Sequence, residues 1–438
     1  MTDKEFLRRR QALLSYMAPS SVVLIFAAPI VIRSHTSTYP YRQNSDFWYF
    51  TGFNESEAAL LLIKISCNND YSVLFNRRNS LQNQIWCGNY LGQKDALKTL
   101  SVNYALPWDC INDELYHFLQ NITIVYHAQG QYDFADRIVL HALNQIRHQS
   151  LTHTTSPITL LDWRPWVREL RLLKSQEEQR ALREAGRISA LAHQSAIKIA
   201  RPDMYEYQLE GEIQRTFHDN GARFPAYNTI IASGENACIL HYTNNDQRMY
   251  AGQLVLIDAG CEFKGYAADV TRTVPVNGTF STPQRAIYNI VLDAITLGLK
   301  LYRPGTTIYS VTQAVVRMMV KRLIQLNIIQ GDLDTLISTN AIHPFFMHKL
   351  SHWIGLDVHD VGGYGENDHR VLKPGMTLTI EPGLYISKRS HVPKEYRGIG
   401  VRIEDDILIT KDGNENFTAS VVKETNAIEH FMMTANIP

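Results

Sequence analysis

The sequence predicts an α/β protein of α+β type, with a mixed α/β N-terminal domain over residues 1–173 and a duplicated second domain over residues 174–438. Three observations support this prediction. The chain has 438 residues, 45% of them apolar and 20% charged, which is typical of a globular protein of two domains. Strand-like runs prevail in the first part, and clear helical periodicity begins at Ser175. From there, one order of elements occurs twice.

The N-terminal domain is expected to alternate strands and helices. A charged segment at residues 5–17 predicts the first helix. Short apolar runs rich in β-branched residues predict strands at 22–28, 59–65, 71–75 and 122–126. Helices are expected at 93–100, 112–119 and 134–145, and the Ser- and Thr-rich residues 148–157 predict a surface connection.

The second domain is expected to consist of two halves, each beginning with a pair of helices. In the first half, Ser175 and Glu178 form a capping-box pattern, Arg201-Pro202 ends the helix, and a second helix is expected at 205–219. In the second half, Thr282-Pro283 is expected to cap a helix that ends before Arg303-Pro304, and another helix follows at 308–326. Strands are expected after each helix pair, at 227–232, 254–258 and 266–275 in the first half and at 376–385 and 399–409 in the second. Such a duplication leaves a cleft where the halves meet, and ligand sites favour clefts of this kind.

The segment LVLIDAGCEFKGYAADVTRT, residues 254–273, is expected to form a β-hairpin that carries two carboxylates. If the turn is centred between its lysine and the following glycine, Asp258 faces Thr271 and lies diagonal to Asp269. Diagonal residues share a face and lie about 7–8 Å apart. Two like charges at this separation indicate a shared metal, a shared proton or a basic partner, unless the pair is solvated on an exposed strand.

Three more candidate ligands occur in the second half. His352 lies in SHWIGLDVHD, Glu381 in TLTIEPGLY and Glu404 in GVRIEDDILI. Glu381 is expected on the polar face of a half-buried strand, and Glu404 on the same face as Arg402. Polar acids on solvated strands are common. The duplication would nevertheless bring all these side chains together.

The number of charges favours two metals rather than one. Four carboxylates in one cleft carry −4, which two divalent cations neutralise, whereas one cation leaves −2. Oxygen donors with one imidazole and no thiolate suit Mn, Co or Fe at least as well as Zn. Two ions about 3.5–4 Å apart suit the hydrolysis of an amide.

The bulk properties exclude several classes of partner. Lys plus Arg equals Asp plus Glu at 43 each, so we expect neither nucleic acid nor a membrane surface as a partner. Five cysteines without a CxxC pair suit a reducing compartment, and no signal peptide is expected because acidic residues interrupt the basic N-terminus. No apolar run approaches the length of about 18 residues that a membrane span needs. The expected location is the cytoplasm.

The ordered set Asp258, Asp269, His352, Glu381 and Glu404 resembles the five-ligand signature of the pita-bread dinuclear metallopeptidases. The segment HKLSHWIGLDVHDVGGY resembles the signature of their proline-specific branch. In the N-terminal domain, YPYRQNSDFWYFTGF, FNRRN, IWCG and VYHAQG resemble bacterial aminopeptidase P. The resemblance covers nearly the whole chain and implies a pita-bread fold for the second domain.

The resemblance also implies roles for the ligands. Asp258 would chelate one metal, Asp269 and Glu404 would bridge both metals, and His352 and Glu381 would complete the other site. Glu381 would also act as the general base. The metals implied are two divalent ions, most readily Mn(II).

Further residues match the family around these ligands. His241, His348 and His359 match histidines that position the substrate and pass protons, and Arg402 matches the arginine beside the last ligand. A histidine on a loop is otherwise more often structural, and Arg402 alone could merely orient Glu404.

Two aromatic residues and one departure from the family pattern bear on the substrate. Tyr227 and Trp86 match aromatic positions near the substrate, although either suits simple packing equally well. Lys349 follows His348 at a position where the family usually has glycine, so its long side chain is expected to narrow the cleft or shift His348.

The function implied is that of an Xaa-Pro aminopeptidase, a metallo-aminopeptidase that releases the N-terminal residue from peptides with proline in second position. The alternatives are a prolidase that accepts only dipeptides, a pita-bread relative that has lost catalysis and serves as a binding protein, and a metal-free relative such as a creatinase. By resemblance we also expect a homo-oligomer, a tetramer of two dimers or a dimer, in which the N-terminal domain helps to close a neighbour's cleft. The aromatic segments around Phe47 to Tyr49 and Trp86 suit such an interface, and equally the core of their own domain.

Overall fold

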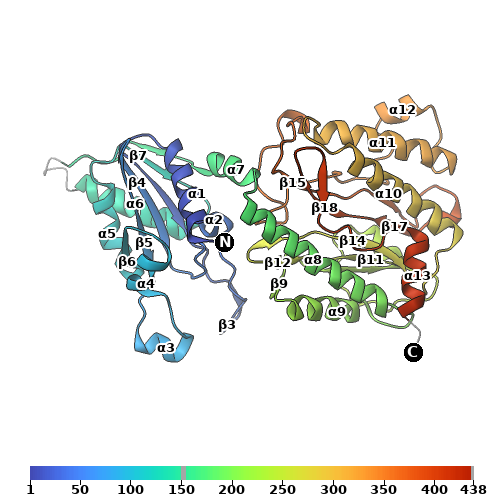
Figure 1. The fold of residues 1–438 in the computed structure, drawn as a ribbon, viewed down its shortest axis with the longest axis horizontal. Coiled ribbons are helices and arrows are strands. Elements are labelled where there is room, and N and C mark those ends of the chain that lie inside the picture. Colours follow the sequence, from blue (N-terminus) through green and yellow to red (C-terminus); the bar gives the residue numbers. More distant parts are fainter. Residues whose placement is uncertain (149–153, 436–438) are drawn as a thin grey trace. The chain divides into compact units, whose positions relative to one another are not determined.

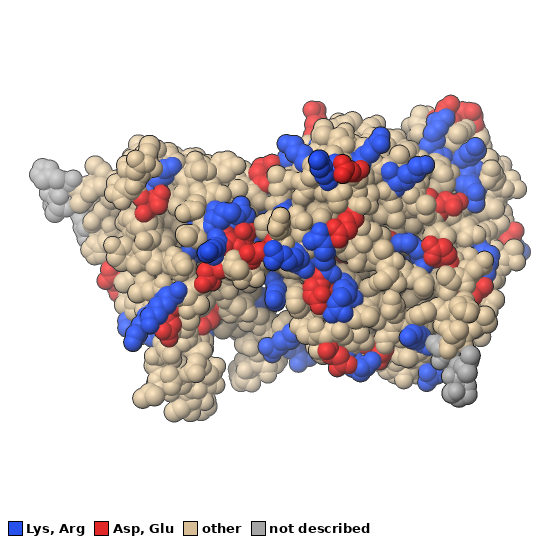
Figure 2. All heavy atoms as spheres, viewed as in Figure 1, with Lys and Arg blue, Asp and Glu red and all other residues tan. Residues whose placement is uncertain are grey.

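The computed structural model describes residues 1–148 and 154–435, so half of the expected connection at 148–157 lies outside the described residues. The chain divides into two compact units, Met1–Leu170 and Arg171–Pro438, close to the expected boundary near Leu173. Figure 1 shows the elements of each unit. Figure 2 shows basic and acidic side chains interspersed on the face in view, in keeping with the zero formal net charge.

The first unit contains a six-stranded mixed sheet in the order β6-β5-β4-β1-β7-β8. Its central strand β1 pairs antiparallel with β4 and parallel with β7. Both neighbours are strands that the sequence predicted. The strands are β1 Ser21–Phe26, β4 Ala59–Ser66, β5 Asn69–Asn76, β6 Tyr104–Pro107, β7 Ile124–His127 and β8 Thr159–Leu161, with a separate small hairpin of β2 Ile32–Ser34 and β3 Ser37–Thr38.

The helices of this unit include all those expected from the sequence. They are α1 Asp3–Tyr16, α2 Ser45–Thr51, α3 Leu81–Cys87, α4 Gly92–Thr99, α5 Ile111–Leu119, α6 Asp133–His148 and α7 Arg164–Leu172. The apolar faces of α5 and α6 share one core with the strands. The short helices α2 and α3 were not predicted, because seven residues give too little periodicity to read.

The aromatic residues of the first unit divide between core and surface. Phe47 and Tyr49 are buried, as expected if they serve their own core. Trp86 is 81% exposed on α3, so packing within its own unit was the wrong alternative for this residue. Its indole is therefore accessible to another molecule.

In the second unit, two helix pairs lie in the predicted order. The helices are α8 Gln176–Ile199, α9 Glu206–Asp219, α10 Thr282–Leu301, α11 Ile308–Gln325, α12 Leu333–Ser338 and α13 Thr425–Ala435. The capping box of Ser175 and Glu178 is present as predicted. For α10, however, the cap is Ser281 rather than Thr282. The Ser281 hydroxyl accepts a hydrogen bond from the Gln284 backbone amide, and the Gln284 side chain accepts one from the Ser281 backbone amide.

The strands of the second unit form several small antiparallel sheets. The orders are β10-β11-β14, β13-β12-β9, β15-β18-β19 and β16-β17. The strands are β9 Phe224–Pro225, β10 Ile230–Ser233, β11 Leu254–Asp258, β12 Cys261–Phe263, β13 Tyr266–Ala267, β14 Thr271–Pro275, β15 Thr377–Ile380, β16 Gly383–Ile386, β17 Ile399–Arg402, β18 Asp405–Ile409 and β19 Asn414–Asn416. The helix pairs and these strands share one large apolar core. This is the expected mixture of helices and antiparallel strands in each half.

One expectation about the second half is wrong. The strand before Glu381 was predicted to be half buried, but every residue of β15 is buried. Its polar side is covered because Thr377 donates a hydrogen bond to the Ile354 carbonyl and Thr379 accepts one from the His352 amide. The strand therefore has a polar face that is buried and hydrogen-bonded rather than solvated.

Candidate metal centre

A single cavity of about 590 Å³ brings the predicted site residues of the second unit together. Every predicted site residue except Trp86 lines it. The lining residues are Tyr227, Asn228, Ile230, Leu240, His241, Thr243, Asp258, Asp269, His348, Lys349, His352, Val358, His359, Tyr364, Glu381, Arg402 and Glu404. Trp86 belongs to the first unit.

The hairpin that carries Asp258 and Asp269 has the predicted register. Asp258 pairs with Thr271, and the same register continues to the pair Phe263 and Tyr266. Lys264 and Gly265 form the turn with φ of 51° and 85°, positive at both positions as in a type I′ hairpin turn. The two aspartates therefore lie diagonally on one face, as the turn position predicted.

Gly260 lets the two arms of this hairpin approach closely between the aspartates. A Cβ at this position would lie 1.7 Å from the Ala268 carbonyl oxygen. Any side chain would force the arms apart, and Asp258 and Asp269 with them. Sequence reasoning did not single out this glycine.

The other two acidic ligands lie where strands are interrupted. Glu381 occupies the break between β15 and β16, and Glu404 the break between β17 and β18. Backbone bonds hold each break: the Glu381 amide donates to the Leu350 carbonyl, and the Glu404 amide donates to the Thr271 carbonyl. The Glu404 break is thereby attached to the aspartate hairpin.

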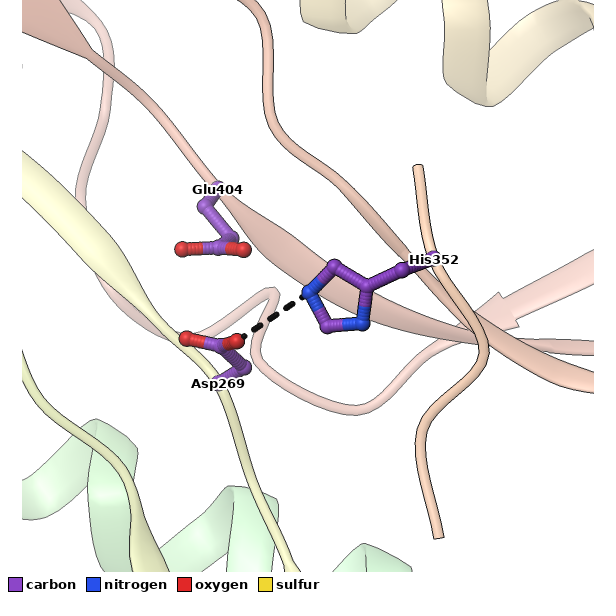
Figure 3. Close-up of side chains that lie close together, drawn as sticks. All are labelled: Asp269, His352 and Glu404. Atoms are coloured by element: carbon purple, nitrogen blue, oxygen red, sulfur yellow. Dashed lines mark ion pairs between the residues drawn. The ribbon is translucent and has the colours of Figure 1, made fainter. Parts of the chain in front are cut away.

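Asp269, His352 and Glu404 form the tightest group of donor atoms, all within 4.8 Å of one another (Figure 3). His352 Nε2 lies 3.4 Å from Asp269 Oδ2 and 3.5 Å from Glu381 Oε1. The opposite ring nitrogen, Nδ1, donates to the Trp353 carbonyl at 3.0 Å. This bond fixes the ring so that Nε2 faces the carboxylates, the arrangement found for metal-bound histidines.

Asp258 differs from the other carboxylate ligands because it forms an ion pair with an arginine. Tyr227 donates to its Oδ1 at 2.6 Å, and the Arg402 guanidinium forms a buried ion pair with its Oδ2. The charge count of −4 made from the sequence therefore omitted one buried cation. Arg402 offsets one of the four negative charges, and the charges of three carboxylates remain for bound cations to neutralise.

The pKa values of the site reflect crowded negative charge. Burial first, and then the charges of Asp269, Glu381 and Asp258, raise the pKa of Glu404 well above its ordinary value. Burial likewise raises the pKa of Glu381 to about 7. Burial alone would lower the pKa of His352, but Asp269 and Glu381 outweigh it and raise that pKa to about 9.

These features fit bound divalent cations. Buried like charges are stable when a cation neutralises them, and the donors are carboxylate oxygens and one imidazole. The nearby buried thiol of Cys261 is engaged elsewhere, with the Ala185 carbonyl. The cluster therefore has the donor set of a hydrolytic centre rather than of a structural zinc site.

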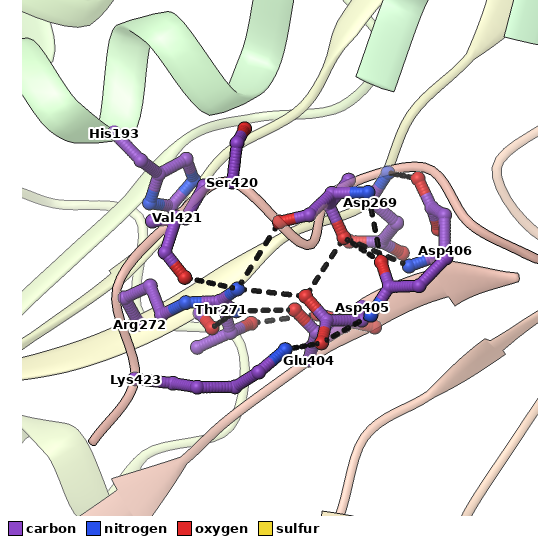
Figure 4. A network of polar contacts seen from close by, with 12 residues as sticks. His193, Asp269, Thr271, Arg272, Glu404, Asp405, Asp406, Ser420, Val421 and Lys423 are labelled. Atoms are coloured by element: carbon purple, nitrogen blue, oxygen red, sulfur yellow. Dashed lines mark hydrogen bonds and ion pairs between the residues drawn. The ribbon is translucent and has the colours of Figure 1, made fainter. Parts of the chain in front are cut away.

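A buried network of polar contacts holds the backbone at Glu404 (Figure 4). Arg272 donates to the Glu404 carbonyl at 2.6 Å and to Asp405 Oδ1 at 2.7 Å, and Lys423 pairs with the other oxygen of Asp405. On the cavity side, Thr271 donates to Glu404 Oε2 at 2.6 Å. The ligand is thus held at both its backbone and its carboxylate.

The three predicted histidines surround the ligands. His348 Nδ1 lies 3.5 Å from Glu381 Oε2, and its Nε2 shares a hydrogen bond with the Tyr385 hydroxyl at 2.8 Å. Burial lowers the pKa of His348 to about 4, so its ring is neutral at pH 7. His359 packs its ring edge-on against His352, with centroids 4.4 Å apart, and His241 lines the cavity from the opposite half.

Tyr385 is a residue that sequence reasoning missed. Its hydroxyl accepts a hydrogen bond from Arg402 Nη1 at 2.9 Å and donates another to His348 Nε2 at 2.8 Å. It therefore connects the arginine beside Asp258 with the histidine beside Glu381. The pairing of β16 with β17 creates this contact, and no sequence spacing reveals it.

Glu206 holds the loop that carries His241. Its buried carboxylate, at the start of α9, accepts bonds from the Ser233 amide and hydroxyl, the Asn236 amide group, the Tyr242 hydroxyl and the Gln247 amide. Tyr242 directly follows His241. One carboxylate thus fixes both ends of the segment on which His241 lies.

Asp360 plays a similar part for His359. Its carboxylate is buried between Arg171 and Lys174, with Lys174 Nζ at 2.8 Å from Oδ2. Burial alone would raise the pKa of Asp360, but the charges of these two residues outweigh it and lower that pKa. The residue after His359 is therefore anchored by a buried ionic cluster.

Comparison with known proteins agrees with this site. The model of metallopeptidase family M24 matches residues 180–411, and that of the aminopeptidase P N-terminal domain matches residues 6–126. The Xaa-Pro aminopeptidase of Escherichia coli is 59% identical over 435 residues, 99% of each chain.

Solved structures give the same result. A variant of Escherichia coli aminopeptidase P in complex with substrate is 58% identical and has a TM-score of 0.99 over 99% of each chain. The zinc-substituted enzyme from the same organism in complex with product is 58% identical, with a TM-score of 0.99 over 100% of each chain. The chain therefore belongs to the Xaa-Pro aminopeptidases of metallopeptidase family M24, which are hydrolases.

Proposed function

We propose that this chain releases the N-terminal residue from peptides whose second residue is proline, using two divalent metal ions. The observation that carries the proposal is the convergence of Asp258, Asp269, His352, Glu381 and Glu404 on one cavity. The substrate named for the relatives, Xaa-Pro, supports the specificity.

The five residues would hold the metals in the roles expected from the family. Asp258, Asp269, His352, Glu381 and Glu404 would together hold the two ions. When bound, such ions supply an activated water and polarise the amide carbonyl. We propose Mn(II), because hard oxygen donors predominate and the chain offers no thiolate there.

The chain's own groups would move the proton and hold the substrate. Glu381 lines the cavity beside the other ligands, where its carboxylate would accept a proton from a nucleophilic water. Neutral His348 and Arg402 line the cavity and are linked by hydrogen bonds through the buried Tyr385 hydroxyl, so they would position the peptide carbonyl groups. His241 and His359 would contact the substrate from the other sides.

Selectivity for proline has a physical basis. An Xaa-Pro bond is a tertiary amide without an N–H, so general peptidases that need a hydrogen bond from this N–H do not cleave it. The cavity offers apolar surface from Ile230, Leu240 and Val358 beside the ligands, which suits a compact ring.

We further propose that the chain acts in the cytoplasm as a homo-oligomer, a dimer or a tetramer of two dimers. The support is the exposed apolar surface of α3, where Leu81, Ile85 and Trp86 are 79%, 82% and 81% exposed. Aromatic residues are enriched in interfaces, and symmetric assembly is the usual outcome of self-association. In this proposal the first unit helps to close a neighbour's cleft, and Trp86 contacts the neighbour's peptide.

None of the helices in the described part of the chain has the length and apolar character that a membrane span requires.

The test is turnover of Xaa-Pro dipeptides and longer Xaa-Pro peptides by the purified chain with Mn(II), Co(II) or Zn(II) added singly. We expect release of the first residue from the longer peptides, and no release when alanine replaces the proline. Turnover of dipeptides alone would indicate a prolidase. No turnover with any metal would indicate a binding protein that has lost catalysis.

A further inference from the structure

We propose that Lys349 is a specificity-determining residue that recognises a carboxylate on the substrate beyond the proline, in competition with Asp368. The carboxylate belongs to the C-terminus of a short peptide. This inference rests on the proposed function and adds to it a preference within the Xaa-Pro peptides.

Lys349 occupies a position from which its charge reaches the substrate. It follows His348, which contacts Glu381, and it lines the same cavity. Among the described residues that line this cavity, the lysine and arginine side chains are those of Lys349 and Arg402. Arg402 is buried and engaged with Asp258, whereas the Lys349 side chain is 58% exposed. Lys349 thus supplies the accessible ammonium group of the site.

Two contacts orient this ammonium group. Lys349 Nζ lies 3.0 Å from Asp368 Oδ1 and 4.5 Å from the centre of the Tyr364 ring. Tyr364 is itself fixed by two contacts with buried Trp353. The two rings stack with their centroids 5.3 Å apart, and the Tyr364 hydroxyl accepts a hydrogen bond from the Trp353 backbone amide at 3.2 Å. The cation therefore rests on a rigid aromatic surface that also lines the cavity.

The backbone accommodates the lysine without strain. Lys349 is not among the described residues with positive φ, so the conformation does not require the glycine that the family usually has here. Its carbonyl oxygen lies 2.8 Å from His348 Nδ1, and the imidazole keeps its contact with Glu381. The side chain adds a charge to the cavity and leaves the catalytic neighbour in place.

Asp368 is a weak and replaceable partner. It lies in the short turn Glu366–Asp368, where Asn367 and Asp368 have φ of 50° and 61°. Its side chain is 29% exposed, and half-exposed ion pairs contribute little stability because water and salt compete for both charges. A substrate carboxylate can therefore take its place beside Lys349.

Lys349 places a positive charge in the cavity that favours the carboxylate end of a short peptide. The carboxylates of the metal centre would be neutralised by the bound ions, so they add no second attraction. A peptide whose C-terminus is blocked and neutral would lose the attraction to Lys349.

The experiment compares the full-length, metal-loaded enzyme on paired peptides Xaa-Pro-Yaa with a free carboxyl group or a C-terminal amide. The readout is the ratio of kcat/KM for the acid to that for the amide. We expect the wild type to favour the acid, Lys349→Met to reduce the ratio about threefold to tenfold, and Lys349→Arg to retain it. Asp368→Asn should raise the ratio, because it removes the competing carboxylate.

The matched control is Lys388→Met. Lys388 forms an exposed ion pair with Glu235 at 2.9 Å and does not line this cavity, so its ratio should equal that of the wild type. A ratio that falls in both Lys349→Met and Asp368→Asn would overturn the inference and indicate that the pair only ties two loops together. An unchanged ratio in Lys349→Met would also overturn it, while activity on Xaa-Pro peptides would leave the proposed function intact. Inactivity of the wild type on all Xaa-Pro peptides would overturn the proposed function itself.

Discussion

The Arg402 guanidinium is paired with Asp258 in an ion pair buried on both sides. One of the four carboxylates at the candidate metal centre thus has a counter-ion that belongs to the protein. Arg402 is held in turn by Tyr385 and Thr271. The cluster of ligands is therefore partly neutralised without metal, and this bears directly on what metal removal does.

Removing the metals should abolish peptidase activity while the fold persists. The second unit has a large apolar core that does not depend on the ligands, unlike a small zinc domain. Chelation followed by dialysis, with activity and circular dichroism measured in parallel, checks this expectation. Returning Mn(II) should restore turnover. Full activity in a metal-free sample would rule out the proposed chemistry, and global unfolding would mean that the metals hold the unit together.

Glu381→Gln should lower kcat by at least a hundredfold, in line with the loss of a positioned general base, at about 10²–10⁴-fold. The amide keeps the shape but neither accepts a proton nor supplies the negative charge. Steady-state kinetics with metal content measured on the same sample checks it. Glu235→Gln, an exposed glutamate paired with Lys388, is the control and should behave as wild type. Activity within a fewfold of wild type in Glu381→Gln would exclude Glu381 as the base.

Glu206→Gln should lower kcat/KM about tenfold to hundredfold with metal content unchanged. The buried amide cannot accept all the bonds that the carboxylate accepts, so the segment carrying His241 would shift, and small displacements of positioning groups cost rates of this order. Kinetics of Glu206→Gln and His241→Ala, singly and combined, separate the two roles. If Glu206 acts through His241, the double variant should be no worse than His241→Ala. Additive losses would show that Glu206 only stabilises the fold.

Asp360→Asn should destabilise the second unit by about 3–5 kcal/mol, because it leaves Arg171 and Lys174 buried without their common carboxylate. The pKa of Asp360 is lowered in the folded state, so the unfolded state binds the proton more readily. The stability from Asp360 is therefore fully present above its ordinary pKa of 3.8 and is lost as the pH falls below it.

Urea unfolding of wild type and Asp360→Asn across acidic and neutral pH checks this prediction. The difference between the two proteins should shrink as the pH falls toward the acid range. Asp334→Asn, at an exposed ion pair with Arg317, should change stability little at any pH. A difference that stays constant with pH would show that ionisation of Asp360 contributes nothing to stability.

Trp86→Ala should impair turnover of longer peptides without changing metal content, if the chain assembles so that α3 contacts a neighbour's cleft. Light scattering at the working concentration checks the assembly. A monodisperse species near the chain mass of 50.0 kDa would refute it. Ile158→Ala, at another exposed apolar residue of the first unit, is the control and should leave turnover of these peptides unchanged. Loss of metal in Trp86→Ala would place this residue in the support of the fold instead.

The hairpin of the site was predictable from the sequence because its geometry is local. An apolar run, a Lys-Gly turn and the alternation of side chains along strands fix the pairing of Asp258 with Thr271 and the diagonal place of Asp269. The order of the helices was predictable for the same reason, since caps and periodicity act within a few residues. His352, Glu381 and Glu404 were also candidates from their segments in the second half, but their roles as ligands were given only by the resemblance to a family.

Tertiary structure alone decided the partners of these groups. The Arg402 ion pair with Asp258, the bond of Tyr385 to His348 and the five bonds of Glu206 join residues far apart in sequence. The same holds for the contact of Lys349 with Asp368, which depends on a turn with two successive positive φ angles. A residue's type and spacing specify the face of a strand or helix on which it lies. Which group meets it there depends on how separate segments pack, because packing is set by the fit of whole surfaces rather than by local preference.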